Sequence, residues 1–110
     1  MNVQPPRLTP EVDVAELDRL FDLRGQRVFL PGGYGAIGES VAIALGRMGA
    51  VVTVAGPKID KAEALAGRIG AMGGTAYGHH MDAAEVSSIT SATQAAVAAM
   101  GGIDVLINCV

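Results

Sequence analysis

Four glycines stand at the place in this 110-residue chain where chemistry is most clearly suggested. Gly32, Gly33, Gly35 and Gly38 fall directly after an apolar run and directly before a helical pattern. Glycine permits a tight turn, and it lets the backbone approach a ligand with no Cβ atom in the way. A helix that begins here offers unpaired N–H groups and a partial positive charge, which suit a phosphate. The pattern therefore predicts a phosphate-binding turn.

The glycine spacing fits three patterns. Gly33, Gly35 and Gly38 fit G-x-G-x-x-G, and Gly32, Gly35 and Gly38 fit G-x-x-G-x-x-G. Gly32, Ala36 and Gly38 fit G-x-x-x-G-x-G with alanine in the middle place. No Lys-Ser or Lys-Thr pair follows the last glycine, which argues against a Walker loop. The alternative to a phosphate site is a glycine-rich turn that holds no ligand.

Strand and helix patterns alternate from residue 27 to the end of the chain, and they give the loop its context. The predicted strands are 27–31, 50–56, 75–81 and 103–110, and the predicted helices are 36–49, 60–72 and 85–100. This alternation requires a parallel sheet with helices on both faces. Ligands of such sheets bind at the carboxyl ends of the strands, where the glycine loop is expected to lie.

Apolar residues at helical spacing predict the buried side of two of these helices. The predicted stripes are Ile37, Val41, Ala44, Leu45 and Met48 in the first helix and Val86, Ile89, Thr93, Val97 and Met100 in the third. In the middle helix, Asp60 is predicted to be the N-cap, with Glu63 three residues later.

The first 22 residues are predicted to form a region of their own, a loose tail followed by a short helix. Asp13 and Glu16 fit a capping box at the start of that helix. Residues 23–110 are predicted to form one domain with the glycine loop near its start.

Composition excludes several classes of function. The net charge is −3 and no Lys/Arg-rich stretch occurs, so we expect no nucleic-acid partner. No run of 18 apolar residues and no signal-peptide pattern is found, so we expect neither a membrane span nor a secreted protein. The single cysteine, Cys109, cannot form an internal disulfide, and a cytoplasmic location is expected.

Three segments resemble the short-chain dehydrogenase/reductases, over about residues 21–110. "VFLPGGYGAIGES" resembles the family's Thr-Gly-x-x-x-Gly-x-Gly loop after the first strand. "HHMDAAE" resembles the segment whose aspartate, here Asp82, contacts the adenine ring, and "IDVLINCV" resembles the run into Asn-Asn-Ala-Gly, with Asn108 as the first Asn. The chain departs from these motifs at Pro31, Ala36, Cys109 and Val110, which replace Thr, Gly, Asn and Ala.

The resemblance implies an incomplete Rossmann-type fold. The expected fold class is α/β, a three-layer parallel sheet of strand order 3-2-1-4 that forms the first half of a dinucleotide-binding domain. The implied cofactor-binding residues are Gly32, Gly33, Tyr34, Gly35, Ala36, Ile37, Gly38, Gly56, Pro57, Lys58, Asp82, Ala83, Asn108 and Cys109.

The end of the second predicted strand bears on the choice between NAD and NADP. An acid at this place binds the ribose 2′-hydroxyl of NAD, and a base accommodates the 2′-phosphate of NADP. The chain reads Ala55-Gly56-Pro57-Lys58 here, with no acid and one base. This favours NADP over NAD, unless Lys58 is only a solvated loop residue.

The catalytic residues of the family have no counterpart in this chain. The family uses a Ser and a Tyr-x-x-x-Lys pair, whereas Tyr34 is followed four residues later by Gly38 and Tyr77 by Met81. We therefore expect no catalytic residue in residues 1–110. We expect no metal site either, because the neighbouring His79 and His80 would point to opposite faces of a strand.

The predicted function follows from the resemblance. It implies the N-terminal, cofactor-binding part of an NAD(P)-dependent oxidoreductase that transfers hydride between NAD(P)(H) and a carbonyl or alcohol substrate. The complete enzyme is expected to be a homo-oligomer. The alternative is a non-catalytic module that binds a dinucleotide as a sensor or as a partner subunit.

Overall fold

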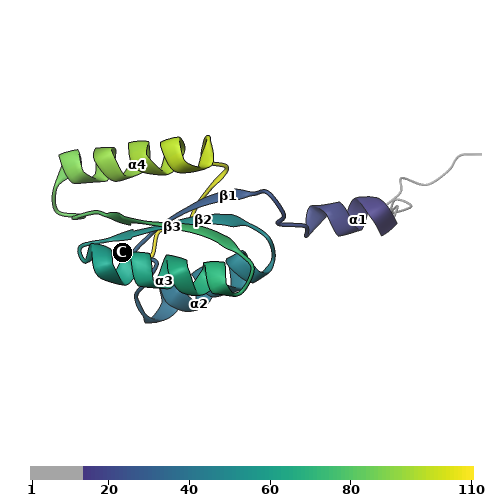
Figure 1. The fold of residues 1–110 in the computed structure, drawn as a ribbon. Helices are drawn as coiled ribbons and strands as arrows, with labels where there is room; N and C mark the ends of the chain where they lie inside the picture. The colour runs from purple at the N-terminus through teal and green to yellow at the C-terminus, as the bar shows by residue number, and fades with distance from the viewer. Residues whose placement is uncertain (1–13) are drawn as a thin grey trace, which may run out of the picture.

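In the computed structural model, which describes residues 14–110, strands and helices alternate along the chain as the sequence predicts (Figure 1). The elements are α1 (Val14–Leu20), β1 (Arg27–Pro31), α2 (Ala36–Arg47), β2 (Val51–Gly56), α3 (Ile59–Ala71), β3 (Thr75–His80), α4 (Val86–Met100) and β4 (Val105–Leu106). Asp13 and the predicted N-terminal tail lie outside the described residues, so the capping box stays a prediction. No helix within residues 14–110 is long and apolar enough to cross a membrane.

The four strands form one parallel sheet in the order β3-β2-β1-β4, which confirms the predicted topology. Figure 1 shows α2 and α3 on one face of the sheet and α4 on the other. Right-handed crossovers explain this division. The chain moves outward from β1 to β3 and then returns past β1 to β4, so α4 must cross on the opposite face.

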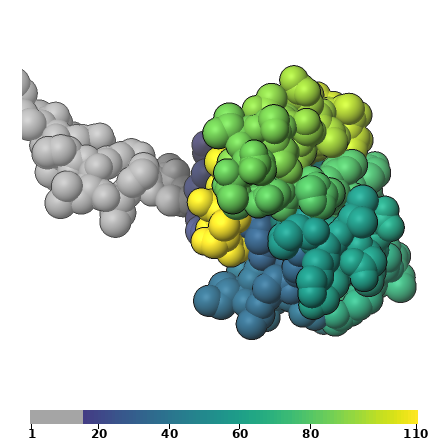
Figure 2. Space-filling model, turned by 90° about the vertical axis from the view of Figure 1, so that its left-hand side faces the viewer, coloured from purple at the N-terminus to yellow at the C-terminus, as the bar shows by residue number. Residues whose placement is uncertain are grey.

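The last strand is much shorter than the predicted 103–110, because regular pairing ends after Leu106. Beyond it, Ile107 N–H still donates to Phe29 O (3.0 Å) and Cys109 N–H to Pro31 O (2.8 Å). Pro31 belongs to the row of β1 residues that faces β4, and it has no N–H to donate in return. A ladder hydrogen bond is therefore lost at Pro31. The residues that follow β4 lie at the molecular surface, between the α4 layer and the α2 layer (Figure 2).

The buried side of α2 differs from the predicted stripe. Its buried residues are Gly38, Ala42 and Gly46, whereas Ile37 is 77% exposed and Met48 is 51% exposed. Small residues allow α2 to pack closely, since a Cβ atom at Gly46 would lie 2.5 Å from Ile69 Cγ2. Val41 and Leu45 of the predicted stripe do pack against the core, but the most buried line of α2 is formed by the small residues, which allow its backbone to approach closely.

A similar correction applies to α4, whose buried residues are Ala92 and Ala96, although Met100 of the predicted stripe also packs against the core on this face. The predicted Val86 is 78% exposed, and Ile89 and Val97 are 39% and 44% exposed. The alanines contact a small core on this face, and the larger apolar side chains flank the contact line.

The start of α3 also differs from the prediction. The helix begins at Ile59, and Lys58, in an extended conformation, is its N-cap. Asp60 lies inside the first turn, so it is not the cap, and no side chain caps this end. An acid in the first turn still favours the helix, through its partial positive N-terminus.

Candidate functional site

The loop between β1 and α2 is a compact turn held by its own backbone. Gly32 N–H donates to Ala55 O (2.8 Å), Gly33 N–H to Leu30 O (3.1 Å) and Gly35 N–H to Gly32 O (3.2 Å). Gly32 has φ +77°, a conformation that side chains with a Cβ atom rarely adopt. These bonds tie the loop to β1 and β2, so the turn is formed before any ligand binds.

Three of the loop glycines are needed by the protein itself, and one of them is Gly33, where a Cβ atom would lie under 3.0 Å from Leu30 and Val54. A Cβ atom at Gly32 would lie 2.5 Å from Cys109 O, and one at Gly38 would lie under 3.0 Å from Gly32 O. Gly35 is different, because its nearest neighbour would be Gly32 O at an ordinary 3.5 Å and its φ is −68°. Gly35 therefore faces open space, where a ligand can approach.

The first turn of α2 offers free donors next to this loop. The first hydrogen bond of the helix is donated by Glu39 N–H to Gly35 O (2.7 Å). Within residues 14–110, the N–H groups of Ala36, Ile37 and Gly38 have no backbone or side-chain acceptor. Three unpaired amides at a helix N-terminus are a binding site for an anion such as a phosphate.

A hollow of about 350 Å³ opens beside the loop, at the carboxyl edge of the sheet. Its lining comes from the segments that follow all four strands: Gly32, Tyr34, Gly35, Gly56, Pro57, Met81, Asp82, Ala83, Cys109 and Val110. Eight of these are predicted cofactor-binding residues, so the fold brings together most of that set. Met81 and Val110 were missed. Their position at the ends of the third and fourth predicted strands was the signal that could have identified them.

The other predicted site residues lie outside this lining. Gly33 is buried against Leu30 and Val54, and Gly38 is buried under the loop. Ala36 and Ile37 are exposed on the first turn of α2. Lys58 is also exposed, and its backbone N–H donates to the Tyr34 hydroxyl oxygen (2.8 Å).

Asp82 lies at the start of the β3–α4 connection and is held there by local hydrogen bonds. Its Oδ1 accepts from Ala84 N–H (3.0 Å), and its own N–H donates to Ser88 Oγ (2.8 Å). The second carboxylate oxygen has no partner among the described residues. It is therefore free to accept a hydrogen bond from a ligand in the hollow.

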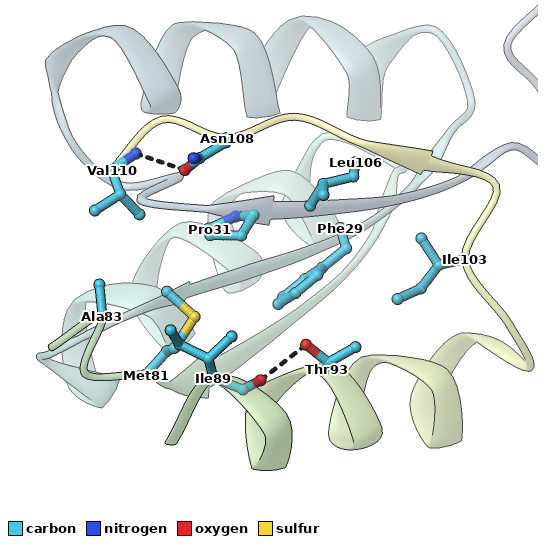
Figure 3. Close-up of a pocket in the computed structure, with 10 residues that line it drawn as sticks. All are labelled: Phe29, Pro31, Met81, Ala83, Ile89, Thr93, Ile103, Leu106, Asn108 and Val110. Atoms are coloured by element: carbon cyan, nitrogen blue, oxygen red, sulfur yellow. Dashed lines mark hydrogen bonds between the residues drawn. The ribbon is translucent and has the colours of Figure 1, made fainter. Parts of the chain in front are cut away.

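A second, apolar hollow of about 440 Å³ lies between α4 and the strands β1 and β4 (Figure 3). It is lined by Phe29, Pro31, Met81, Ala83, Ile89, Thr93, Ile103, Leu106, Asn108 and Val110. Its polar groups bond within the chain: Thr93 Oγ1 donates to Ile89 O (2.8 Å), and Asn108 Oδ1 accepts from Val110 N–H (3.1 Å). Asn108 thus lines the apolar hollow, whereas its neighbour Cys109 lines the hollow beside the glycine loop.

Comparison with known proteins identifies the family. A family model described as short chain dehydrogenase matches residues 26–110. The chain belongs to the short-chain dehydrogenases. This confirms the predicted family, and family membership does not favour the alternative of a non-catalytic module.

Several short-chain dehydrogenases are similar to this chain. A fatty acyl-CoA reductase of Mycobacterium tuberculosis is 34% identical over 87 residues, which are 79% of this chain and 30% of the relative. A D-threitol dehydrogenase of Mycolicibacterium smegmatis is 34% identical over 95 residues, 84% of this chain and 36% of the relative. A metagenomic short-chain oxidoreductase solved in complex with NADP is 33% identical, with a TM-score of 0.71 over 77% of this chain and 38% of that chain.

The chain spans about a third of the length of these short-chain dehydrogenases, and it corresponds to their N-terminal part. The family binds NAD(P), and the glycine loop with its free amides belongs to this part. The incomplete Rossmann-type fold predicted from the sequence is therefore confirmed.

Proposed function

We propose that this chain supplies the cofactor-binding half of an NAD(P)-dependent oxidoreductase that acts on a carbonyl or alcohol group. The observation that carries the proposal is the set of three free amides, Ala36 to Gly38, beside a hollow formed by the ends of four parallel strands. A dinucleotide needs this combination, an anion site for its pyrophosphate and a groove for its adenosine.

Each part of the cofactor has a proposed partner. The amides of Ala36, Ile37 and Gly38 would bind the pyrophosphate, and the ribose would lie at Gly56 and Pro57. Asp82 and Ala83 would border the adenine, with the free carboxylate oxygen of Asp82 as the acceptor for its amino group. When bound, the nicotinamide ring gives or takes the hydride, and the residues of this chain bind and orient the cofactor.

The preferred cofactor is proposed to be NADP. No acid stands at Gly56, the end of β2, so no carboxylate there repels a 2′-phosphate. The exposed Lys58 is two residues further along and can place a positive charge near the phosphate. The similar metagenomic oxidoreductase was solved with NADP, which supports the same choice.

The complete enzyme is further proposed to be a cytoplasmic homo-oligomer whose catalytic Ser, Tyr and Lys lie outside residues 1–110. Its substrate class stays broad, because one relative is named for a fatty acyl-CoA and another for a polyol.

The proposal is tested by titrating the full-length protein with NADPH and NADH and following fluorescence. We expect Gly38→Val to weaken dinucleotide binding at least tenfold, because the new side chain meets the backbone of Gly32 and Gly33 and displaces the amides. Gly67→Val is the matched control, because Gly67 is exposed on α3, lines neither hollow and has no heavy atom within 4 Å of an added Cβ, and we expect a change of less than about twofold in binding. We expect tighter binding of NADPH than NADH, with Lys58→Ala narrowing the difference.

Two results would overturn parts of this proposal. A folded Gly38→Val protein that binds the cofactor as well as the unmodified protein would remove the loop from the site. A preference for NADH that Lys58→Ala leaves unchanged would contradict the choice of NADP.

A further inference from the structure

Tyr34 connects the glycine loop to the turn between β2 and α3. Its hydroxyl oxygen accepts a hydrogen bond from Lys58 N–H (2.8 Å). Its ring lies over Gly56, where a Cβ atom would come within 3.0 Å of Tyr34 Cε1, Cζ and Oη. The ring therefore occupies the space that a side chain at position 56 would need.

The Tyr34 ring lies where an acid at the end of β2 would stand. In dinucleotide-binding folds an acid near this strand end binds the 2′-hydroxyl of the adenosine ribose. A carboxylate side chain at position 56 would meet the far end of the Tyr34 ring, which would have to move aside. With glycine at position 56, the ring keeps its place over the end of β2.

The Tyr34 hydroxyl is also equipped to replace that acid. A phenol hydroxyl has one proton to donate as well as lone pairs to accept. Lys58 N–H uses a lone pair, so the O–H of Tyr34 remains available as a donor. Within residues 14–110 no acceptor for this proton is found, and Tyr34 lines the hollow together with Gly56 and Pro57.

We propose that Tyr34 is the specificity-determining residue that recognises the 2′ substituent of the adenosine ribose. This inference rests on the proposed function. A neutral donor suits a 2′-phosphate, because a hydrogen bond to a charged oxygen is about twice as strong as one between neutral groups. The same hydroxyl gives only a neutral hydrogen bond to the 2′-hydroxyl of NAD. Asp82 is the one carboxylate among the residues that line this hollow, and one of its oxygens is held by Ala84 N–H.

The first test replaces only the hydroxyl. In the full-length protein, Tyr34→Phe keeps the ring over Gly56 and removes the donor, and the exposed Lys58 N–H can bond to water instead. We expect the Kd for NADPH to rise about tenfold, which corresponds to about 1.4 kcal/mol, and the Kd for NADH to change less than about threefold. Tyr77→Phe is the matched control, because Tyr77 lies on β3 and lines neither hollow.

A second pair of probes isolates the 2′ position. Adenosine 2′,5′-bisphosphate and adenosine 5′-monophosphate differ only in the 2′-phosphate. We expect Tyr34→Phe to weaken the first about tenfold and to leave the second unchanged. A thermal melt of each variant shows whether it is folded.

A third variant uses the contact between the Tyr34 ring and position 56. The double substitution Tyr34→Ala with Gly56→Asp removes the ring and supplies the acid, so we expect the preference to shift from NADPH toward NADH. Gly56→Asp alone must displace the ring, and we expect it to weaken both cofactors.

The outcomes separate this inference from the proposed function. If the unmodified protein binds neither cofactor, the proposed function fails. If it binds NADPH but Tyr34→Phe changes both cofactors equally, or neither, the role of Tyr34 is wrong and the proposed function stands.

Discussion

The two faces of the sheet are closed to different degrees. On the face covered by α2 and α3, Val28, Leu30, Val52 and Val54 pack against helix residues such as Ile69, and all five are at most 2% exposed. On the face covered by α4, the buried cluster is smaller, with Phe29, Ala55, Met81, Ala92 and Ala96. Beside that cluster lies the apolar hollow of about 440 Å³.

The difference shows which part of the candidate site is preformed. The glycine loop leads into α2, and α2 is fixed by close contacts of Gly38 with the loop backbone and of Gly46 with the Ile69 side chain. The amides that we propose for the pyrophosphate therefore lie at the start of a helix on the closed face, where packing holds them. The apolar hollow lies on the α4 face, next to the last strand, β4. Only two residue pairs join β4 to β1, against five between β1 and β2.

The largest difference is expected between two substitutions, one on each face, in how much each lowers the free energy of unfolding. Ile69→Ala on the closed face should lower the free energy of unfolding by about 2–5 kcal/mol, because a fully buried side chain leaves a cavity. Ile89→Ala on the open face should cost less than about 1 kcal/mol, since Ile89 is 39% exposed and already lines a hollow. Urea unfolding of both variants measures this. Equal losses would contradict the contrast between the faces.

A smaller effect is expected at the β4 edge. Leu106 is 64% exposed and Val110 is 72% exposed, and an apolar edge strand is a template for pairing with another chain. We predict that the polypeptide 1–110 alone has no dehydrogenase activity and self-associates, and that Leu106→Lys weakens the association about tenfold. Sedimentation at several concentrations measures it.

Thr75→Lys, which adds the same charge at the β3 edge, is the control for that experiment. We expect it to leave the association unchanged. A polypeptide 1–110 that stays monomeric and melts cooperatively above about 60 °C, in the upper range for mesophile domains, would contradict the prediction.

The smallest effect is expected from the ion pair that holds the other end of the β4 segment. Arg27 donates from Nε and Nη2 to Asp104 (2.9 Å each), and its backbone N–H donates as well (2.9 Å). These hydrogen bonds lower the pKa of Asp104 from 3.8 to about 2. A carboxylate with a lowered pKa stabilises the fold above its unfolded pKa of about 4, and the contribution is lost as the pH falls toward 2.

Acid unfolding of the full-length protein between pH 4 and pH 2 tests this ion pair. We expect Asp104→Asn to reduce the loss of stability over that range. Asp22→Asn is the control, because Asp22 pairs with Arg24, two residues away, and such neighbours also meet in the unfolded chain. The pKa of Asp22 is also lowered to about 2, yet we expect a smaller change from its substitution. Equal changes in the two variants would show that the Arg27–Asp104 pair contributes no more to stability in acid than the pair of sequence neighbours Asp22 and Arg24.

Local patterns were sufficient to predict the order of the elements and the glycine turn, and the family resemblance supplied the strand order. Short apolar runs, helical spacing and glycine depend on neighbours in sequence, and the handedness of the crossovers depends on chirality alone. Eight of the residues that the resemblance named line one hollow in the structure, because each lies at or after the end of a strand and the carboxyl ends of parallel strands share one edge of the sheet.

Contacts between distant residues decided the rest. The sequence by itself specified an α/β sheet with a loop for phosphate, but hydrophobic spacing could not show that Gly38, Ala42 and Gly46 form the buried side of α2. That face is set by how closely the α2 backbone approaches the Ile69 side chain of α3 at Gly46 and the glycine loop at Gly38, which depends on residues outside α2. The end of β4 was decided by Pro31, 74 residues before Val105 and without an N–H to share. The contact between Tyr34 and Gly56 likewise joins two loops that only the folded sheet brings together, so no pattern in either segment could reveal it.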